Sequence, residues 1–273
     1  MPGRERAQRI EAVVLRHNDW GEADRILVLY TLEMGKIRVV AKGVRKIRSR
    51  KAGHLEPFTR VALLLARGRD MPIVTQAETL DAYLGVRKDF LKTTYAAHVV
   101  ELLDRFTFEE GENPAVYRLL VNTLERLSTP LPAEVPVHYY RIRLLDLLGF
   151  RPQLFQCSVC AREIQPENQF FSAEQGGVVC PRCGPQQAGA RPVSQDALRY
   201  LRHFQRSNYS TALKAQLPAT INREMEDLIE YYLTYLLERS LNTPPFLRRA
   251  RAAAHQAQYI AQDWPDESPP HDR

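Results

Sequence analysis

The hydrophobic period of this chain changes near residue 84, and that change limits the fold more than any other feature. Up to Tyr83, apolar residues alternate or form short runs, as they do in strands. After Leu84 they recur every three to four residues, as on one face of a helix. The sequence therefore predicts an α+β, multidomain protein in which a β domain comes first and a helical domain follows.

Short strands are expected in segments 10–15, 26–31, 37–40, 58–66 and 73–80. A closed or partly open barrel suits five short strands better than an open sheet, because closure hides the edges. The five-stranded OB-fold is the best-known barrel of this size that binds nucleic acid. An SH3-like barrel is the alternative, and counting strands does not separate the two.

Helices are expected where the longer period holds. Asn113 followed by Pro114 is typical of a helix start, and so is Ser194 before the next apolar stripe. The segment from Thr220 to Leu241 is predicted to be the longest helix, stopped by Pro244-Pro245. The expected domains span residues 1–82 for the OB-fold, 83–250 for the helical domain, 153–188 for a metal-binding insert within it, and 251–273 for a partly disordered tail.

Positive charge is concentrated at the start of the chain. Residues 1–80 hold 16 Lys+Arg against 9 Asp+Glu, which leaves 22 against 23 in the remainder. A basic domain in an otherwise balanced chain is typical of a nucleic-acid-binding module. Membrane-surface binding is the rival interpretation, but this segment contains no basic amphipathic helix.

Residues 36–51 carry eight cations and no acid. Such a run needs either solvent or a polyanion around it, and the uneven charge of the whole chain favours the polyanion. The candidate nucleic-acid contacts are Lys36, Arg38, Lys42, Arg45, Lys46, Arg48, Arg50 and Lys51. Aromatic residues are few before residue 80 (Trp20, Tyr30 and Phe58), so we expect this surface to grip phosphates more than bases.

The four cysteines form two CxxC pairs. Cys157 and Cys160 precede Cys180 and Cys183 at a spacing typical of zinc sites. Each CxxC turn can place two thiolates on one ion, and a hairpin between the pairs would bring them together. Because four sulfur ligands leave no open position, the prediction is one structural zinc ion. A redox dithiol and an iron–sulfur cluster are the rival interpretations.

Motifs for catalysis are missing from the sequence. It contains no Walker A motif, no GxGxxG, no GxSxG and no HExxH. His54 and Glu56 match the H-x-E of zinc deaminases, but Val179 stands where that family has proline. We therefore expect no enzyme, with a zinc hydrolase or a dithiol oxidoreductase as the rival classes. No targeting segment and no membrane-length apolar run is visible, so a cytosolic protein is expected.

Several stretches resemble the RecO family of bacterial recombination mediators. They are GEADRILVLYT (21–31), Gly35-Lys36, AKGVRK (41–46) and the order of barrel, helices and four-cysteine insert. Glu238-Arg239-Ser240 followed by Phe246-Leu247 resembles the closing segment of the family.

The resemblance implies an OB-fold that binds single- and double-stranded DNA and anneals complementary strands without catalysis. It also implies that RecR is a partner in loading RecA onto DNA coated by single-stranded DNA-binding protein (SSB), whose acidic C-terminal tail is contacted. By position, the eight cations would touch DNA, and the four cysteines match the zinc pattern of the family. The implied location is cytoplasmic and nucleoid-associated. The alternative is an RNA-binding zinc-ribbon protein associated with translation, which competition between matched DNA and RNA would distinguish.

Overall fold

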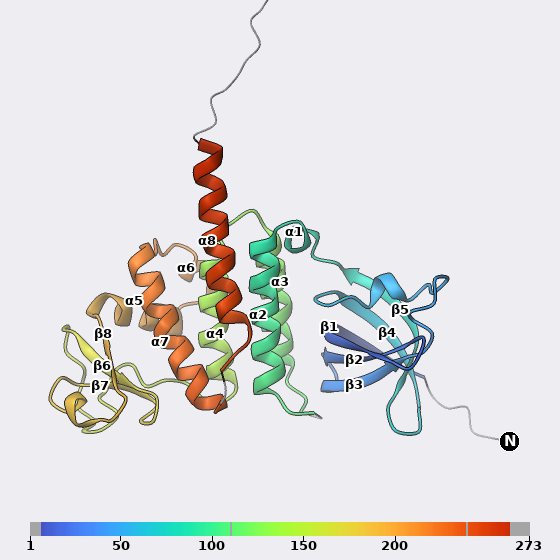
Figure 1. Ribbon diagram of the computed structural model, residues 1–273. Coiled ribbons are helices and arrows are strands. Elements are labelled where there is room, and N and C mark those ends of the chain that lie inside the picture. Colours follow the sequence, from blue (N-terminus) through green and yellow to red (C-terminus); the bar gives the residue numbers. More distant parts are fainter. Residues whose placement is uncertain (1–6, 110, 239, 263–273) are drawn as a thin grey trace, which may run out of the picture.

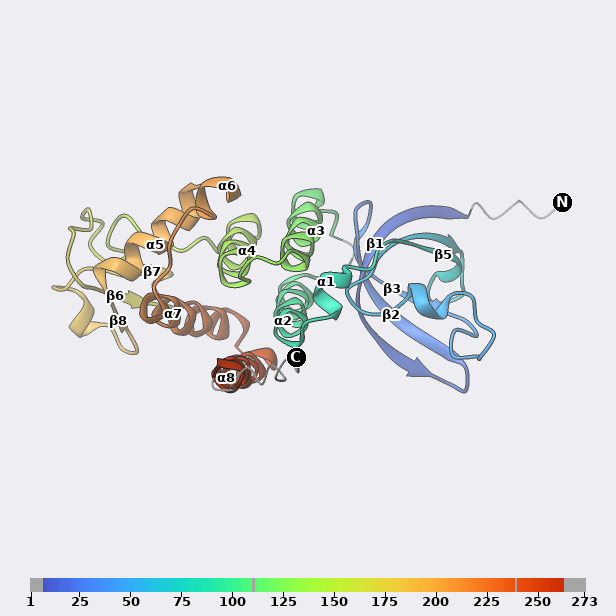
Figure 2. The same cartoon turned by 90° about the horizontal axis from the view of Figure 1, so that it is seen from above.

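The computed structural model describes residues 7–109, 111–238 and 240–262. Three parts follow one another along the molecule: a β-barrel, a group of helices and a small cysteine-containing subdomain (Figures 1 and 2). Arg239 of the closing segment and residues 263–273 of the predicted tail lie outside the described residues.

The barrel is built from five strands. They are β1 (Gln8–Trp20), β2 (Asp24–Thr31), β3 (Gly35–Ala41), β4 (Arg60–Ala66) and β5 (Ile73–Asp81). The sheet closes in the order β1-β2-β3-β5-β4, with β3 and β5 parallel at Val40 and Ile73. This is the strand order of an OB-fold, so the predicted fold is confirmed and the SH3-like alternative is excluded. Strand β1 continues past the expected end at Leu15, because an irregularity between Val14 and Arg16 bends it and pairing with β2 resumes.

The middle of β1 and the second half of β2 are buried on both faces. One face lines the core of the barrel, with Ile10, Ala12, Val14, Leu27 and Leu29. The other face packs against the helices, with Val13, Leu15, Val28 and Tyr30. This double burial explains why these strands read as nearly continuous apolar runs.

Eight helices occur in the described ranges. They are α1 (Leu84–Arg87), α2 (Phe90–Phe106), α3 (Pro114–Ser128), α4 (Glu134–Leu147), α5 (Gln195–Arg206), α6 (Tyr209–Ala212), α7 (Ala219–Leu237) and α8 (Thr243–Gln262). The predicted caps are confirmed: the Asn113 side chain accepts a hydrogen bond from Val116 N, and Ser194 accepts one from Ala197 N. None of the helices described is both long enough and apolar enough to cross a membrane.

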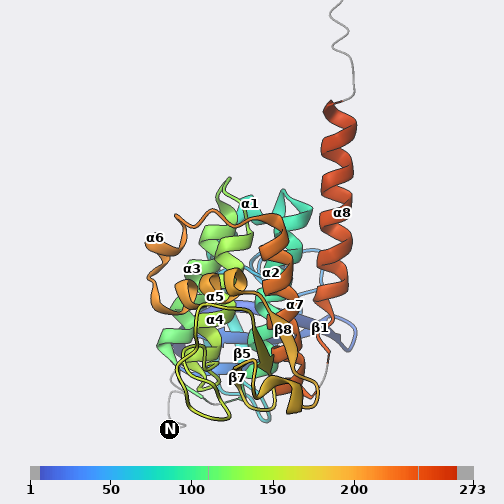
Figure 3. The same cartoon turned by 90° about the vertical axis from the view of Figure 1, so that its left-hand side faces the viewer.

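The end of the chain differs from the prediction. Helix α7 ends at Leu237, where Glu238 adopts a left-handed φ of 51°, and its 19 residues are fewer than the 20 of α8. The prediction that it reaches Leu241 and is the longest helix is therefore wrong. Pro244 and Pro245 lie in the first turn of α8, where a backbone N–H is not needed, so they begin a helix. Helix α8 runs unbroken across residue 250 and projects beyond the other helices (Figures 1 and 3).

The cysteine subdomain contains a three-stranded sheet of β6 (Gln169–Ser172), β7 (Gly177–Val179) and β8 (Arg191–Val193). Strands β6 and β7 form the hairpin expected between the two cysteine pairs. Its Phe171 ring packs edge-on against Tyr232 of α7, with centroids 5.4 Å apart. The subdomain thus shares one hydrophobic core with the helices, whereas the barrel interior has a core of its own.

Candidate nucleic-acid interface and metal centre

Three connections meet at the barrel end that faces away from the helices. They are the β1–β2 turn (21–23), the basic loop (42–59) between β3 and β4, and the β4–β5 turn (67–72). Arg45 N donates to Ala23 O at 2.9 Å, which ties the basic loop to the first turn. Val40 N donates to Pro72 O at 2.9 Å, which places the last turn beside the start of the loop. We call this surface the free end of the barrel; it lies on the right in Figures 1 and 2.

Four of the predicted contact residues point into solvent at the free end. The side chains of Lys42, Lys46, Arg48 and Arg50 are exposed. Within the described ranges they form no ion pair and no side-chain hydrogen bond. Their charges are therefore available to a polyanion.

Two further predicted residues hold the basic loop in place. Arg45 Nη1 donates to the carbonyls of Gly21 and Glu22, each at 3.3 Å, and Arg45 Nε lies 3.2 Å from Asp19 Oδ2. Lys51 Nζ donates to Val74 O at 2.9 Å, and burial lowers the pKa of this amine. These contacts fix the loop near its start and at its middle, and the cations between Arg45 and Lys51 stay exposed.

The structure separates Lys36 and Arg38 from the other six cations. Lys36 Nζ donates to the backbone carbonyl of Asp104 at 2.6 Å and lies 3.2 Å from its carboxylate. Arg38 Nε lies 2.7 Å from a carboxylate oxygen of Glu109. Only 12% of the Lys36 side chain is exposed. Both residues lie where the barrel meets the helical part, so they fall outside the proposed contact surface.

Sequence reasoning missed three residues at the free end. Arg67 and Arg69 are exposed on the β4–β5 turn, and Trp20 is 58% exposed at the end of β1. The arginines flank Gly68 in a turn between two predicted strands, which was a usable signal. Their closeness to the basic loop depends on the parallel β3–β5 pairing, which no local pattern shows.

The four cysteines converge. Their sulfur atoms all lie within 4.8 Å of one another, and Cys160 Sγ is 3.9 Å from Cys180 Sγ. The first CxxC turn is closed by Ala161 N, which donates to Cys157 O at 2.8 Å. In the second turn Gly184 N donates to Cys180 O at 2.9 Å. Two matching turns and a hairpin thus build a closed four-sulfur cluster that suits a metal ion.

The cluster favours the ionised, thiolate form of Cys157. Burial alone would raise the pKa of Cys157, but backbone N–H groups of Cys180, Cys160 and Val159 outweigh it and lower that pKa to about 6. The bond from Cys180 N to Cys157 Sγ is 3.3 Å long. Hydrogen bonding with Cys180 raises the pKa of Cys183 to about 12. A bound cation would supply the charge that lets all four thiols ionise together.

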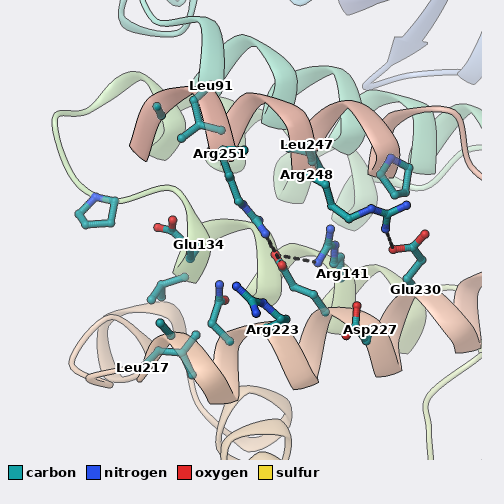
Figure 4. A pocket seen from close by; sticks show the side chains of 18 of the residues that line it. Leu91, Glu134, Arg141, Leu217, Arg223, Asp227, Glu230, Leu247, Arg248 and Arg251 are labelled. Carbon is teal, nitrogen blue, oxygen red and sulfur yellow. Dashed lines mark hydrogen bonds and ion pairs between the residues drawn. The ribbon is translucent and has the colours of Figure 1, made fainter. Parts of the chain in front are cut away.

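A pocket of about 900 Å³ lies between α4, α7 and α8 (Figure 4). At its floor Glu226 pairs with Arg251, and Arg141 Nη1 lies 3.9 Å from Glu226 Oε1. At its rim Arg248 pairs with Glu230 at 3.0 Å. The Arg141, Glu226 and Arg251 side chains are each at most 20% exposed and join three helices. Burying a charge is costly unless it is paired.

Together these features define a class of protein: an OB-fold barrel with a basic free end, joined to a helical domain that carries a cluster of four cysteines suited to a metal ion. The family described as Recombination protein O N terminal matches residues 6–83, and the one described as Recombination protein O C terminal matches residues 87–245.

Curated relatives agree with both matches. The chain is 37% identical over 248 residues to DNA repair protein RecO of Roseiflexus sp., covering 91% of this chain and 87% of the relative. It is 36% identical over 231 residues to DNA repair protein RecO of Dehalococcoides mccartyi, covering 85% and 91%. For DNA repair protein RecO of Bifidobacterium adolescentis the identity is 38% over 239 residues, covering 85% and 96%. The chain therefore belongs to the RecO family, and this membership supports a role in DNA repair and recombination.

Proposed function

We propose that the protein is a non-catalytic, DNA-binding recombination mediator. It binds single- and double-stranded DNA, anneals complementary strands and, with RecR, helps to load RecA onto DNA coated by SSB. The observation that carries this proposal is the set of unpaired cations on the basic loop, Lys42, Lys46, Arg48 and Arg50, at the free end of the OB-fold. The proposed location is the cytoplasm, in association with the nucleoid.

Phosphate contact accounts for annealing without a chemical step. Cations that neutralise the backbones of two strands reduce the repulsion between them and release condensed counterions. Long, solvated lysine and arginine side chains suit phosphates of any sequence, because phosphates carry no sequence information. If about five phosphates are neutralised, the log–log salt slope on single strands is roughly −3.5.

The proposed cofactor is one structural zinc ion held by Cys157, Cys160, Cys180 and Cys183. Sulfur ligands in a tetrahedral set suit zinc, and a site closed by four ligands holds a fold together. The ion would fix the β6–β7 hairpin, whose Phe171 packs on Tyr232 of α7. The metal then stabilises the helical part and lies away from the free end of the barrel.

The pocket between α4, α7 and α8 supports the proposed contact with the acidic tail of SSB. Its lining combines Leu217 and Leu247 with Arg223, for which the structure gives no ion pair in the described ranges. Arg141 Nη1 is buried there and makes no hydrogen bond with the described residues. An acidic peptide with apolar side chains would pair with Arg223 and pack on the two leucines, whereas Arg141 already faces Glu226 and the lining also contains Glu134 and Asp227.

Annealing of two complementary oligonucleotides tests the proposal, with one strand precoated with SSB and no nucleotide present. The protein should accelerate annealing, and the effect should fall away at high salt. A Lys42→Glu/Lys46→Glu variant should lose most of the acceleration. An Arg118→Glu/Arg199→Glu variant makes the same charge change at exposed helix positions and should keep it. No acceleration, together with tight binding of structured RNA, would favour the RNA-binding zinc-ribbon alternative.

A further inference from the structure

Trp20 is the last residue of β1 and projects from the free end of the barrel. Its side chain is 58% exposed, although it belongs to a regular strand and pairs with Asp24 in the β1–β2 ladder. The strand fixes its backbone, so the indole is presented from a rigid position. An exposed aromatic residue alone would mean little, because single ones are common on protein surfaces.

Trp20 lies on a hairpin that is hydrogen-bonded to the basic loop, and this position suggests a role in binding. Asp24, its partner across the ladder, accepts a hydrogen bond from Gly43 N at 2.7 Å. Asp19, the residue before it, pairs with Arg45. Asp19, next to Trp20 on the strand, and Asp24, opposite it, are thus both bonded to the start of the basic loop. These bonds hold the hairpin that carries Trp20 beside the loop, and Glu22 in the turn is exposed.

A flat aromatic ring beside phosphate-binding cations is the arrangement that proteins use to hold single strands. A base stacked on a ring contributes about 1–3 kcal/mol in such sites, whatever its sequence. In an OB-fold, the β1–β2 connection is one of the loops that border the nucleic-acid surface. Duplex DNA cannot use the ring in this way, because its bases are already stacked on one another.

We propose that Trp20 stacks on an unpaired base while Lys42 and Lys46 hold the neighbouring phosphates, so that the free end prefers single strands to duplexes. This inference rests on the proposed DNA binding and deepens it. It also changes the expectation that the barrel grips phosphates with little contribution from bases. The ligand class is a single-stranded oligonucleotide with intact bases.

The test compares an oligothymidine with an abasic strand of equal length, which carries the same phosphates without bases. Both strands are added to the full chain carrying Trp264→Phe. The sequence has two tryptophans, so Trp20 is then the only one that contributes fluorescence. We expect the thymidine strand to quench the Trp20 fluorescence and to bind more tightly than the abasic strand. Trp20→Ala should weaken binding of the thymidine strand roughly 5- to 150-fold and leave the abasic strand and a duplex within about twofold. Trp20→Phe should keep part of the preference.

Phe90→Ala is the matched control, since it removes a 68% exposed aromatic side chain from α2. It should leave the preference unchanged. Equal weakening of the thymidine and abasic strands by Trp20→Ala, or no weakening of either, would overturn the inference while leaving salt-dependent DNA binding in place. If the Lys42→Glu/Lys46→Glu variant binds both strands as the parent does, the proposed function itself fails and the inference falls with it.

Discussion

Lys36 Nζ and the backbone carbonyl of Asp104 lie 2.6 Å apart, and this hydrogen bond joins the barrel to helix α2. The Asp104 carboxylate also pairs with Arg16 at 2.8 Å. Burial would raise the pKa of Asp104, but these two cations outweigh it and hold the pKa below its ordinary value. A lysine from a basic run thus serves as a connection between two parts of the chain.

Replacing Lys36 by methionine should lower stability and spare DNA binding. The change leaves the Asp104 carbonyl without its donor, at a cost of roughly 1–3 kcal/mol in the free energy of unfolding. Urea unfolding and fluorescence anisotropy with a labelled oligonucleotide measure the two effects. Arg38→Met is the control: its pair with Glu109 is about half exposed and should contribute about 0–1 kcal/mol. A tenfold loss of affinity with unchanged unfolding would instead make Lys36 a DNA contact.

Arg67 and Arg69 should contribute to DNA binding although they lie outside the basic run. If each neutralises one phosphate, the double alanine variant should make the log–log salt slope on single strands shallower by about 1.4. Titrations at several salt concentrations measure the slope. Arg118→Ala/Arg199→Ala should leave it unchanged. A slope that stays the same in the Arg67/Arg69 variant would confine the contact surface to the basic loop.

The purified protein should contain one zinc ion per chain. Metal analysis measures the content, and a thiol reagent should reach the four cysteines rapidly only after chelation. Cys180→Ser should lose the metal and lower the melting temperature, because Val178 and Phe171 belong to the core shared with the helices. Single-strand affinity should stay within about twofold, since the barrel has a core of its own. Four freely reactive thiols in the untreated protein would contradict a metal site.

His138 should make the helical part less stable in mild acid. Its ring is fully buried, and burial together with Arg141 lowers its pKa to about 4, although Glu226 opposes the change. The unfolded chain takes up the proton near pH 6.5, whereas the folded chain does not until about pH 4. The contribution of His138 to stability is therefore full above pH 6.5 and falls as the pH drops from 6.5 to 4, by roughly 2 kcal/mol between pH 7 and pH 5. The buried His98, whose pKa burial also lowers, adds to the loss in the same direction.

Urea unfolding at pH 7 and pH 5 measures the loss of unfolding free energy. In His138→Gln this loss should be smaller by roughly 2 kcal/mol. The proton resonances of the His138 ring offer a direct check. A ring that titrates near pH 6.5 in the folded protein would disprove the explanation.

Short stretches of sequence determined the secondary structure, two helix caps and the cysteine cluster of this protein. The strands and helices follow from apolar periodicity, and Asn113 and Ser194 start helices because each side chain bonds a backbone N–H three residues on. The cysteine cluster follows from two CxxC turns joined by a hairpin. These features are local, so the residues that make them are close together in the chain.

The tertiary structure alone decided which basic side chains lie at the free end of the barrel and which lie at its junction with the helices. Lys36 and Lys42 belong to one basic run, yet strand β3 carries the first to the junction with α2 and the second to the free end. Arg67 lies on a turn whose last residue, Pro72, is placed beside the start of the basic loop by the parallel pairing of β3 with β5. Trp20 reaches the same surface because β1 continues past its bulge and its hairpin bonds to Arg45. Each of these placements depends on pairings between distant residues, which a local pattern does not encode.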